Sequence, residues 1–141
     1  MTQGKPEIYI IDDDPGVLFL HRIIVEELDL GSSPRTFPDA GEALESITLL
    51  DTSTTRILIF LDINMPKMDG WEFLVSLEKN IRHADIKVVM VTSSLSKIER
   101  ERSREFEAVI DFWEKPMEDT QVSALKEKLG DWLLNSSSNN V

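Results

Sequence analysis

Acidic residues stand at two places in the sequence where a short apolar run ends. Asp12 and Asp13 follow the run Glu7 to Ile11, and Asp62 follows the run Ile57 to Leu61. Carboxylates that are held close together repel, so their ionised forms coexist only with a cation among them. Oxygen ligands with no Cys or His nearby favour Mg²⁺ over zinc. The three acids therefore predict a magnesium site.

A hydroxyl group and an ammonium group follow two other apolar runs. Thr92 comes directly after Ile86 to Val91, and Lys115 stands just beyond the run Val109 to Trp113. A lysine supplies a mobile positive charge and a threonine supplies an O–H donor, and both suit the oxygens of a phosphoryl group. An aspartate among such groups can attack phosphorus and form an acyl phosphate. This chemistry makes Asp62 the candidate nucleophile, with Lys115 and Thr92 beside it.

The apolar runs alternate with segments that have the apolar spacing of helices. Runs such as Ile57 to Leu61 are nearly continuous in apolar residues, which is typical of parallel strands covered on both faces. Helix starts are indicated by Asp14 before a proline and by candidate capping boxes at Asp39, Asp69 and Ser96. The predicted strands are 7–11, 33–37, 57–61, 86–91 and 109–113.

This alternation predicts a parallel sheet with right-handed crossovers and a layer of helices on each face. We expect an α/β fold: a flavodoxin-like three-layer sandwich with a five-stranded parallel sheet of order 2-1-3-4-5 and five helices. In an open parallel sheet the carboxyl ends of all strands share one edge, and ligands bind there, where the strand order reverses. One topology thus brings the dispersed polar residues into one pocket. They are Asp12, Asp13, Asp62, Thr92 and Lys115.

Four segments in this order resemble the receiver domain of two-component response regulators, over about residues 7–135. They are Ile10 to Pro15, Leu61 to Gly70, Val91 to Ser94 and Glu114 to Pro116. The resemblance implies that Asp62 is the phosphoacceptor. It also implies that the message passes to a downstream protein effector, since nothing after residue 135 resembles an output domain.

The same resemblance assigns roles to the residues around Asp62. Asp13 is implied to bind Mg²⁺ directly and Asp12 to bind it through water, with the main-chain carbonyl of Asn64 as a further ligand. Lys115 is implied to pair with the phosphoryl group, and its bond to Pro116 to be cis. These roles follow from the family pattern and are treated as expectations.

The resemblance further implies a switch. Thr92 would move toward the phosphoryl group, and Phe112 would rotate into the space that it leaves. The fourth helix, fifth strand and fifth helix would then repack into a face for a partner. The phosphodonor would be a phosphohistidine on a sensor histidine kinase or a histidine phosphotransfer protein. We therefore expect a signalling domain and not an enzyme that turns over an external substrate.

Length and composition agree with one compact domain, predicted over 1–135 with a flexible tail over 136–141. The chain has 141 residues, of which 41% are hydrophobic, and a net charge of −11. That charge argues against direct binding to DNA, because the phosphate backbone would repel it. The absence of cysteine excludes disulfides and thiolate metal sites. No apolar run is long enough for a membrane span or a signal peptide, so we expect a cytoplasmic protein.

Two other classes of function compete with this interpretation. A phosphatase resembling the haloacid dehalogenases would also use an aspartyl phosphate, but it needs an acid two residues after the nucleophile, where this chain has Asn64. A flavodoxin-like module that binds a nucleotide or flavin would need a glycine-rich phosphate loop. In this chain acidic residues follow the first predicted strand, and they repel a phosphate group when no metal is bound.

Some residues are ambiguous between core and surface. The first predicted helix has apolar spacing at Val17, Leu20, Ile24 and Leu28. His21, in the same helix, is expected to be structural or exposed rather than a ligand. Trp113 is either a core residue or a contact for a partner, and both interpretations stay open at this point.

Overall fold

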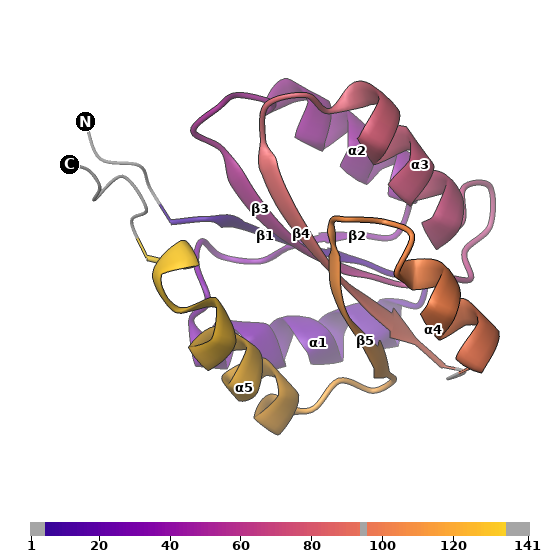
Figure 1. The fold of residues 1–141 in the computed structure, drawn as a ribbon. Coiled ribbons are helices and arrows are strands. Elements are labelled where there is room, and N and C mark those ends of the chain that lie inside the picture. The colour runs from indigo at the N-terminus through magenta and orange to yellow at the C-terminus, as the bar shows by residue number, and fades with distance from the viewer. Residues whose placement is uncertain (1–4, 94–95, 135–141) are drawn as a thin grey trace.

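A computed structural model of the protein describes residues 5–93 and 96–134 (Figure 1). The predicted tail over 136–141 and Ser94 lie outside these described residues. The strands are β1 (Glu7–Ile11), β2 (Arg35–Phe37), β3 (Arg56–Leu61), β4 (Asp85–Thr92) and β5 (Val109–Glu114). The helices are α1 (Pro15–Leu28), α2 (Ala40–Leu49), α3 (Gly70–Asn80), α4 (Lys97–Ser103) and α5 (Asp119–Leu129), and a short 3₁₀ helix, η1 (Gly130–Trp132), follows α5.

The strands form one parallel sheet of order β2-β1-β3-β4-β5, which confirms the predicted topology. Four of the predicted strands agree with the structure to within one residue at each end, while β2 begins two residues later than expected. In the pairing of β1 with β3, Ile11 lies opposite Leu61. The residues that follow, Asp12 and Asp62, therefore leave the sheet side by side.

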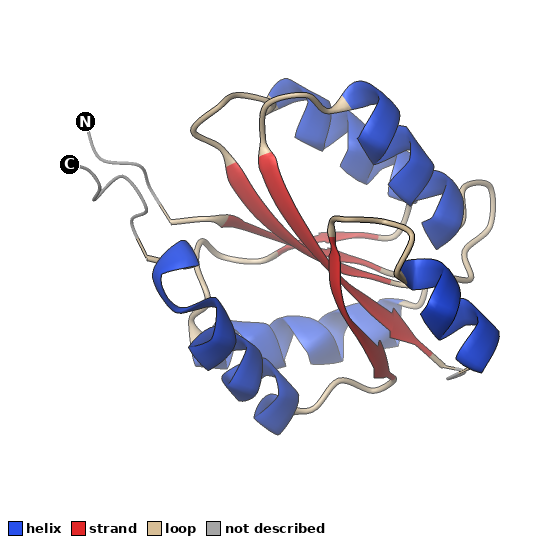
Figure 2. Ribbon diagram, in the orientation of Figure 1, coloured by secondary structure: helices blue, strands red, loops and turns tan. Residues whose placement is uncertain are grey.

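Helices cover both faces of the sheet, as Figure 2 shows, with α1 and α5 on one face and α2 and α3 on the other. Alternate residues of a strand point to opposite faces. In β1, Ile8 and Ile10 pack with Leu18 of α1 and Leu125 of α5. The side chains of the alternate β1 positions belong to the cluster on the α2 and α3 side. Both faces of the central strands are thus buried, which explains their continuous apolar runs.

Local hydrogen bonds start the helices where the sequence predicts. The Asp14 side chain accepts from the backbone N–H of Gly16 and of Val17 and so caps α1. Asp69 and Glu72 form a complete capping box at α3. Asp39 and Ser96 each accept from the backbone N–H three residues later. These caps fix the first turn of the helix that follows each strand end.

The inner face of α1 differs only in part from the predicted one, because Ile24 and Leu28 pack against the apolar core as expected. Leu18, His21 and Val25 are buried, whereas Leu20 is 42% exposed. The helix is rotated because it must pack against both the sheet and α5, and periodicity alone does not determine that rotation. Trp113 is buried, with its ring centroid 5.9 Å from that of Phe60, so it belongs to the core. Within the described residues, no helix is both long and apolar enough to cross a membrane.

Candidate functional site

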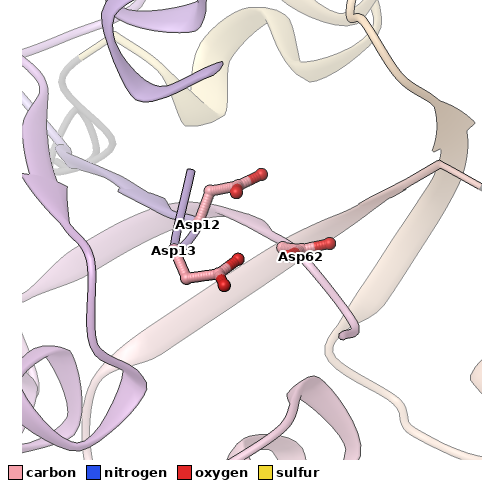
Figure 3. A group of neighbouring side chains, drawn as sticks. All are labelled: Asp12, Asp13 and Asp62. Atoms are coloured by element: carbon pink, nitrogen blue, oxygen red, sulfur yellow. The ribbon is translucent and has the colours of Figure 1, made fainter. Parts of the chain in front are cut away.

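Three carboxylates meet at the carboxyl ends of β1 and β3. Asp12 and Asp13 extend from β1 and Asp62 extends from β3, and Figure 3 shows their side chains next to one another. One carboxylate oxygen from each residue lies within 4.8 Å of the others. Asp12 and Asp62 are only 2% and 3% exposed, whereas Asp13 is exposed. The cluster is therefore open to solvent on the Asp13 side.

Lys115 bridges two of these carboxylates. Its Nζ lies 2.7 Å from Oδ2 of Asp12 and 3.1 Å from Oδ1 of Asp62. The Lys115 backbone N–H donates to the carbonyl of Thr92 at 2.7 Å, which ties the end of β5 to the end of β4. The bond between Lys115 and Pro116 is cis, as the family pattern implied. Residues from β1, β3 and β5 thus converge on one cluster.

The charges of the cluster do not balance. Three carboxylates against one ammonium group leave an excess of two negative charges. Burial, and then the charge of Asp12, raises the pKa of Asp62 to about 6, although Lys115 acts in the opposite direction. Burial disfavours the charged form of Lys115, but its contacts with Asp12 and Asp62 outweigh burial and raise its pKa. A divalent cation with oxygen ligands fits this donor set and this charge.

The two predicted switch residues lie on neighbouring strands. Thr92 is the fully buried last residue of β4 and pairs in register with Glu114. Phe112, two residues earlier in β5, is 7% exposed and therefore points inward. The guanidinium carbon of Arg100 lies 5.5 Å from the centre of the Phe112 ring. Phe112 thus occupies a buried position beneath α4.

Asn64 lies in the loop between β3 and α3, two residues beyond Asp62, and is exposed. Ser93, which follows Thr92, is exposed as well. The structure therefore brings Asp12, Asp13, Asp62 and Lys115 into one cluster and places Asn64 in the loop beside it. Whether the Asn64 carbonyl binds a metal stays a prediction.

Comparison with known proteins decides the family. The sequence model of the response regulator receiver domain matches residues 8–126. The chain belongs to this family. The cyclic di-GMP phosphodiesterase response regulator RpfG of Xanthomonas campestris is 29% identical over 117 residues, which cover 83% of this chain and 30% of RpfG. The chain thus spans less than a third of the length of that relative.

Solved structures agree with the receiver-domain fold. A CheY-like response regulator receiver domain protein from Methanospirillum hungatei is 25% identical, with a TM-score of 0.69 over 90% of this chain and 95% of that one. A two-component response regulator from Cytophaga hutchinsonii shares the fold at 21% identity, with a TM-score of 0.76 over 89% of this chain and 97% of that one. The predicted receiver domain of two-component signalling is confirmed, and the dehalogenase-like phosphatase finds no support.

Gly70 is a residue of the receiver-domain site to which sequence reasoning gave no role. A Cβ atom at Gly70 would lie 2.6 Å from the backbone oxygen of Asp62 and 2.9 Å from the Cα of Ile63. The Gly70 N–H also donates to the carbonyl of Ile63 at 2.8 Å, which closes the loop. The only signal in the sequence is a glycine directly after the helix cap Asp69. The start of α3 therefore touches the backbone that carries the candidate nucleophile.

We expect Gly70→Ala to weaken both stability and Mg²⁺ binding, because the added methyl group must displace the Asp62 backbone. The expected loss of stability is about 1–3 kcal/mol, measured by urea unfolding, with Mg²⁺ affinity measured by titration calorimetry. Gly41→Ala is the control, because a Cβ there would meet a side-chain oxygen of Asp39 and no backbone atom. Equal effects of the two substitutions on Mg²⁺ affinity would contradict this role of Gly70.

Proposed function

We propose that this receiver domain accepts a phosphoryl group on Asp62 from a phosphohistidine in a Mg²⁺-dependent reaction. The observation that carries the proposal is the buried cluster in which Lys115 touches both Asp12 and Asp62. Asp12, Asp13, Asp62 and the Asn64 carbonyl would hold the metal, with Asp13 binding it directly and Asp12 through water. When bound, Mg²⁺ supplies positive charge against the excess carboxylates and the phosphoryl oxygens.

The protein's own residues perform the transfer by position and charge. A carboxylate oxygen of Asp62 attacks phosphorus, a new P–O bond forms, and the P–N bond to the donor histidine breaks. The electron pair of that bond stays with the imidazole nitrogen, which takes up a proton. Lys115 lies close enough to Asp62 to pair with the phosphoryl oxygens, and Asp12 holds the Lys115 ammonium group in place. The product is an acyl phosphate on Asp62.

A protein partner would recognise the phosphorylated state through the surface formed by α4, β5 and α5. Thr92 ends β4 next to this surface, and its hydroxyl would move toward the phosphoryl group. Phe112 is the bulky side chain in β5 that would respond by rotating. On the exposed side of α4, Ile98 is 77% exposed, an apolar group available to a protein partner. The two arrangements of Thr92 and Phe112 would form the two-state element.

The proposal extends to partners and location. The phosphodonor would be a sensor histidine kinase or a histidine phosphotransfer protein, and the signal would pass from this domain to a downstream protein effector. Direct DNA binding is disfavoured by the net charge of −11. The receiver domain would occupy 1–135, act in the cytoplasm, and turn over no substrate beyond its own acyl phosphate.

Incubation with Mg²⁺ and acetyl phosphate tests the proposal by intact mass. We expect a gain of one phosphoryl group in the wild-type protein and none in Asp62→Ala, with the gain abolished by a metal chelator. Asp119→Asn removes an exposed acid of α5 and is expected to accept the group normally. Phosphorylation that persists in Asp62→Ala would refute the assignment of the site.

A further inference from the structure

His21 is a titratable residue buried in the middle of α1, outside the acid cluster. It is 1% exposed, and it lies on the inner face of the helix between Leu18 and Val25. Burial lowers its pKa to about 4, so the imidazole is neutral at neutral pH. A buried imidazole on an otherwise apolar helix face needs a hydrogen-bond partner.

The imidazole has a partner far away in the sequence. His21 Nε2 accepts a hydrogen bond from the backbone N–H of Met117 at 3.1 Å. Because Nε2 is the acceptor, the proton of the neutral ring must be on Nδ1. Met117 lies in the loop between β5 and α5, and Figure 1 shows α1 and α5 on the same face of the sheet. The bond therefore connects α1 to the loop that begins at Lys115.

Two backbone hydrogen bonds, at Lys115 and at Met117, hold the first three residues of this loop. Lys115 N–H is bonded to the Thr92 carbonyl, and two residues later Met117 N–H is bonded to His21. The Met117 side chain is 2% exposed and packs in the core cluster beneath α1 and α5. The backbone that carries Lys115 is thus fixed on the β4 side by one bond and on the α1 side by another.

We propose that His21 is a positioning residue, which holds the β5–α5 loop so that the Lys115 ammonium group lies against Asp12 and Asp62. The inference rests on the proposed function, since it concerns the lysine that would pair with the phosphoryl group. His21 acts through the Met117 amide and touches neither metal nor phosphate. A small displacement of a positioned charge strongly changes its interaction with the reacting groups beside it.

Mg²⁺ affinity measures the placement of Lys115 without any phosphoryl chemistry. The ammonium group competes with a cation for Asp12 and Asp62, so withdrawing it is expected to raise Mg²⁺ affinity. His21→Phe keeps an aromatic ring but removes the acceptor, and His21→Gln restores an acceptor oxygen at a similar distance along the side chain. We expect Mg²⁺ to bind several-fold more tightly to His21→Phe and within about twofold of the wild-type affinity to His21→Gln.

A double-mutant cycle separates positioning from a general packing effect. In a Lys115→Ala background, His21→Phe is expected to leave Mg²⁺ affinity unchanged, because the group that it positions is already gone. Val25→Ala, one turn further along the same buried face, should lower stability and leave Mg²⁺ affinity at the wild-type value. Equal effects of His21→Phe in the two backgrounds, or a shift with Val25→Ala as large as with His21→Phe, would overturn the inference.

Two further measurements keep the inference testable if His21→Phe does not fold or if Mg²⁺ does not bind. Hydrogen exchange in the wild-type protein should show a protected Met117 amide, and exchange at the rate of an open loop would overturn the inference. A crystal structure of His21→Phe, or of His21→Leu in its place, should show the Lys115 ammonium group moved away from Asp62. An unmoved Lys115 overturns the role of His21, whereas absence of phosphorylation on wild-type Asp62 overturns only the proposed function.

Discussion

Asp62→Asn is expected to stabilise the metal-free receiver domain at pH 7 by up to about 3 kcal/mol. Burial, together with the charge of Asp12, raises the pKa of Asp62 from 3.8 to about 6. At pH 7 the carboxylate is therefore ionised in surroundings that disfavour its charge. An asparagine keeps the shape of the side chain and removes the charge, so the cost of ionisation disappears.

The size of this gain depends on pH. Because the pKa of Asp62 is raised in the folded protein, the protonated acid carries no penalty below about pH 4, and the wild-type protein loses stability as the pH rises through about 6. The difference between wild type and Asp62→Asn should thus be near zero at about pH 4 and constant above about pH 7. Urea unfolding in the presence of a chelator measures it at each pH, with Asp119→Asn as the exposed control. A gain that does not change with pH would not arise from the ionisation of Asp62.

Removal of the Lys115 ammonium group should have the opposite effect on stability. Lys115→Ala leaves the buried carboxylates of Asp12 and Asp62 facing each other without the charge that now bridges them. Breaking such a pair costs about 3 kcal/mol when the remaining charges stay buried. Mg²⁺ should offset part of this loss, and its affinity should rise by about tenfold, because the metal no longer competes with an ammonium group.

Lys115→Ala should still accept a phosphoryl group on Asp62 but lose much of the conformational response, because the pairing between Lys115 and the phosphoryl oxygens is gone. Hydrogen exchange of α4, β5 and α5 before and after phosphorylation measures that response. Lys79→Ala, which removes a lysine from the exposed side of α3, should behave like the wild type in both experiments. A full exchange response in phosphorylated Lys115→Ala would contradict the role of Lys115 in the switch.

Much of the candidate site can be predicted from sequence because a parallel sheet converts sequence position into spatial position. Every strand of such a sheet ends at the same edge, so a residue that directly follows a buried apolar run is placed there without knowledge of the packing. Asp12 and Asp62 follow β1 and β3, and the register that sets Ile11 opposite Leu61 brings them together. The helix starts at Asp14 and Asp69 can also be predicted from sequence, because a capping side chain bonds to amides in the first turn of its own helix.

The rotation of α1 and the partner of His21 depend on tertiary structure alone. The apolar residues of α1 form more than one possible stripe, and contact with the sheet and α5 buries Leu18, His21 and Val25 while Leu20 stays exposed. The bond from Met117 to His21 joins residues 96 positions apart, which no local pattern encodes. The close approach of Gly70 to the Asp62 backbone and the burial of Trp113 are likewise decided by packing between elements. Sequence periodicity determines which elements form and which ends of the strands carry chemistry, whereas the side-chain contacts between distant elements arise only when the layers pack.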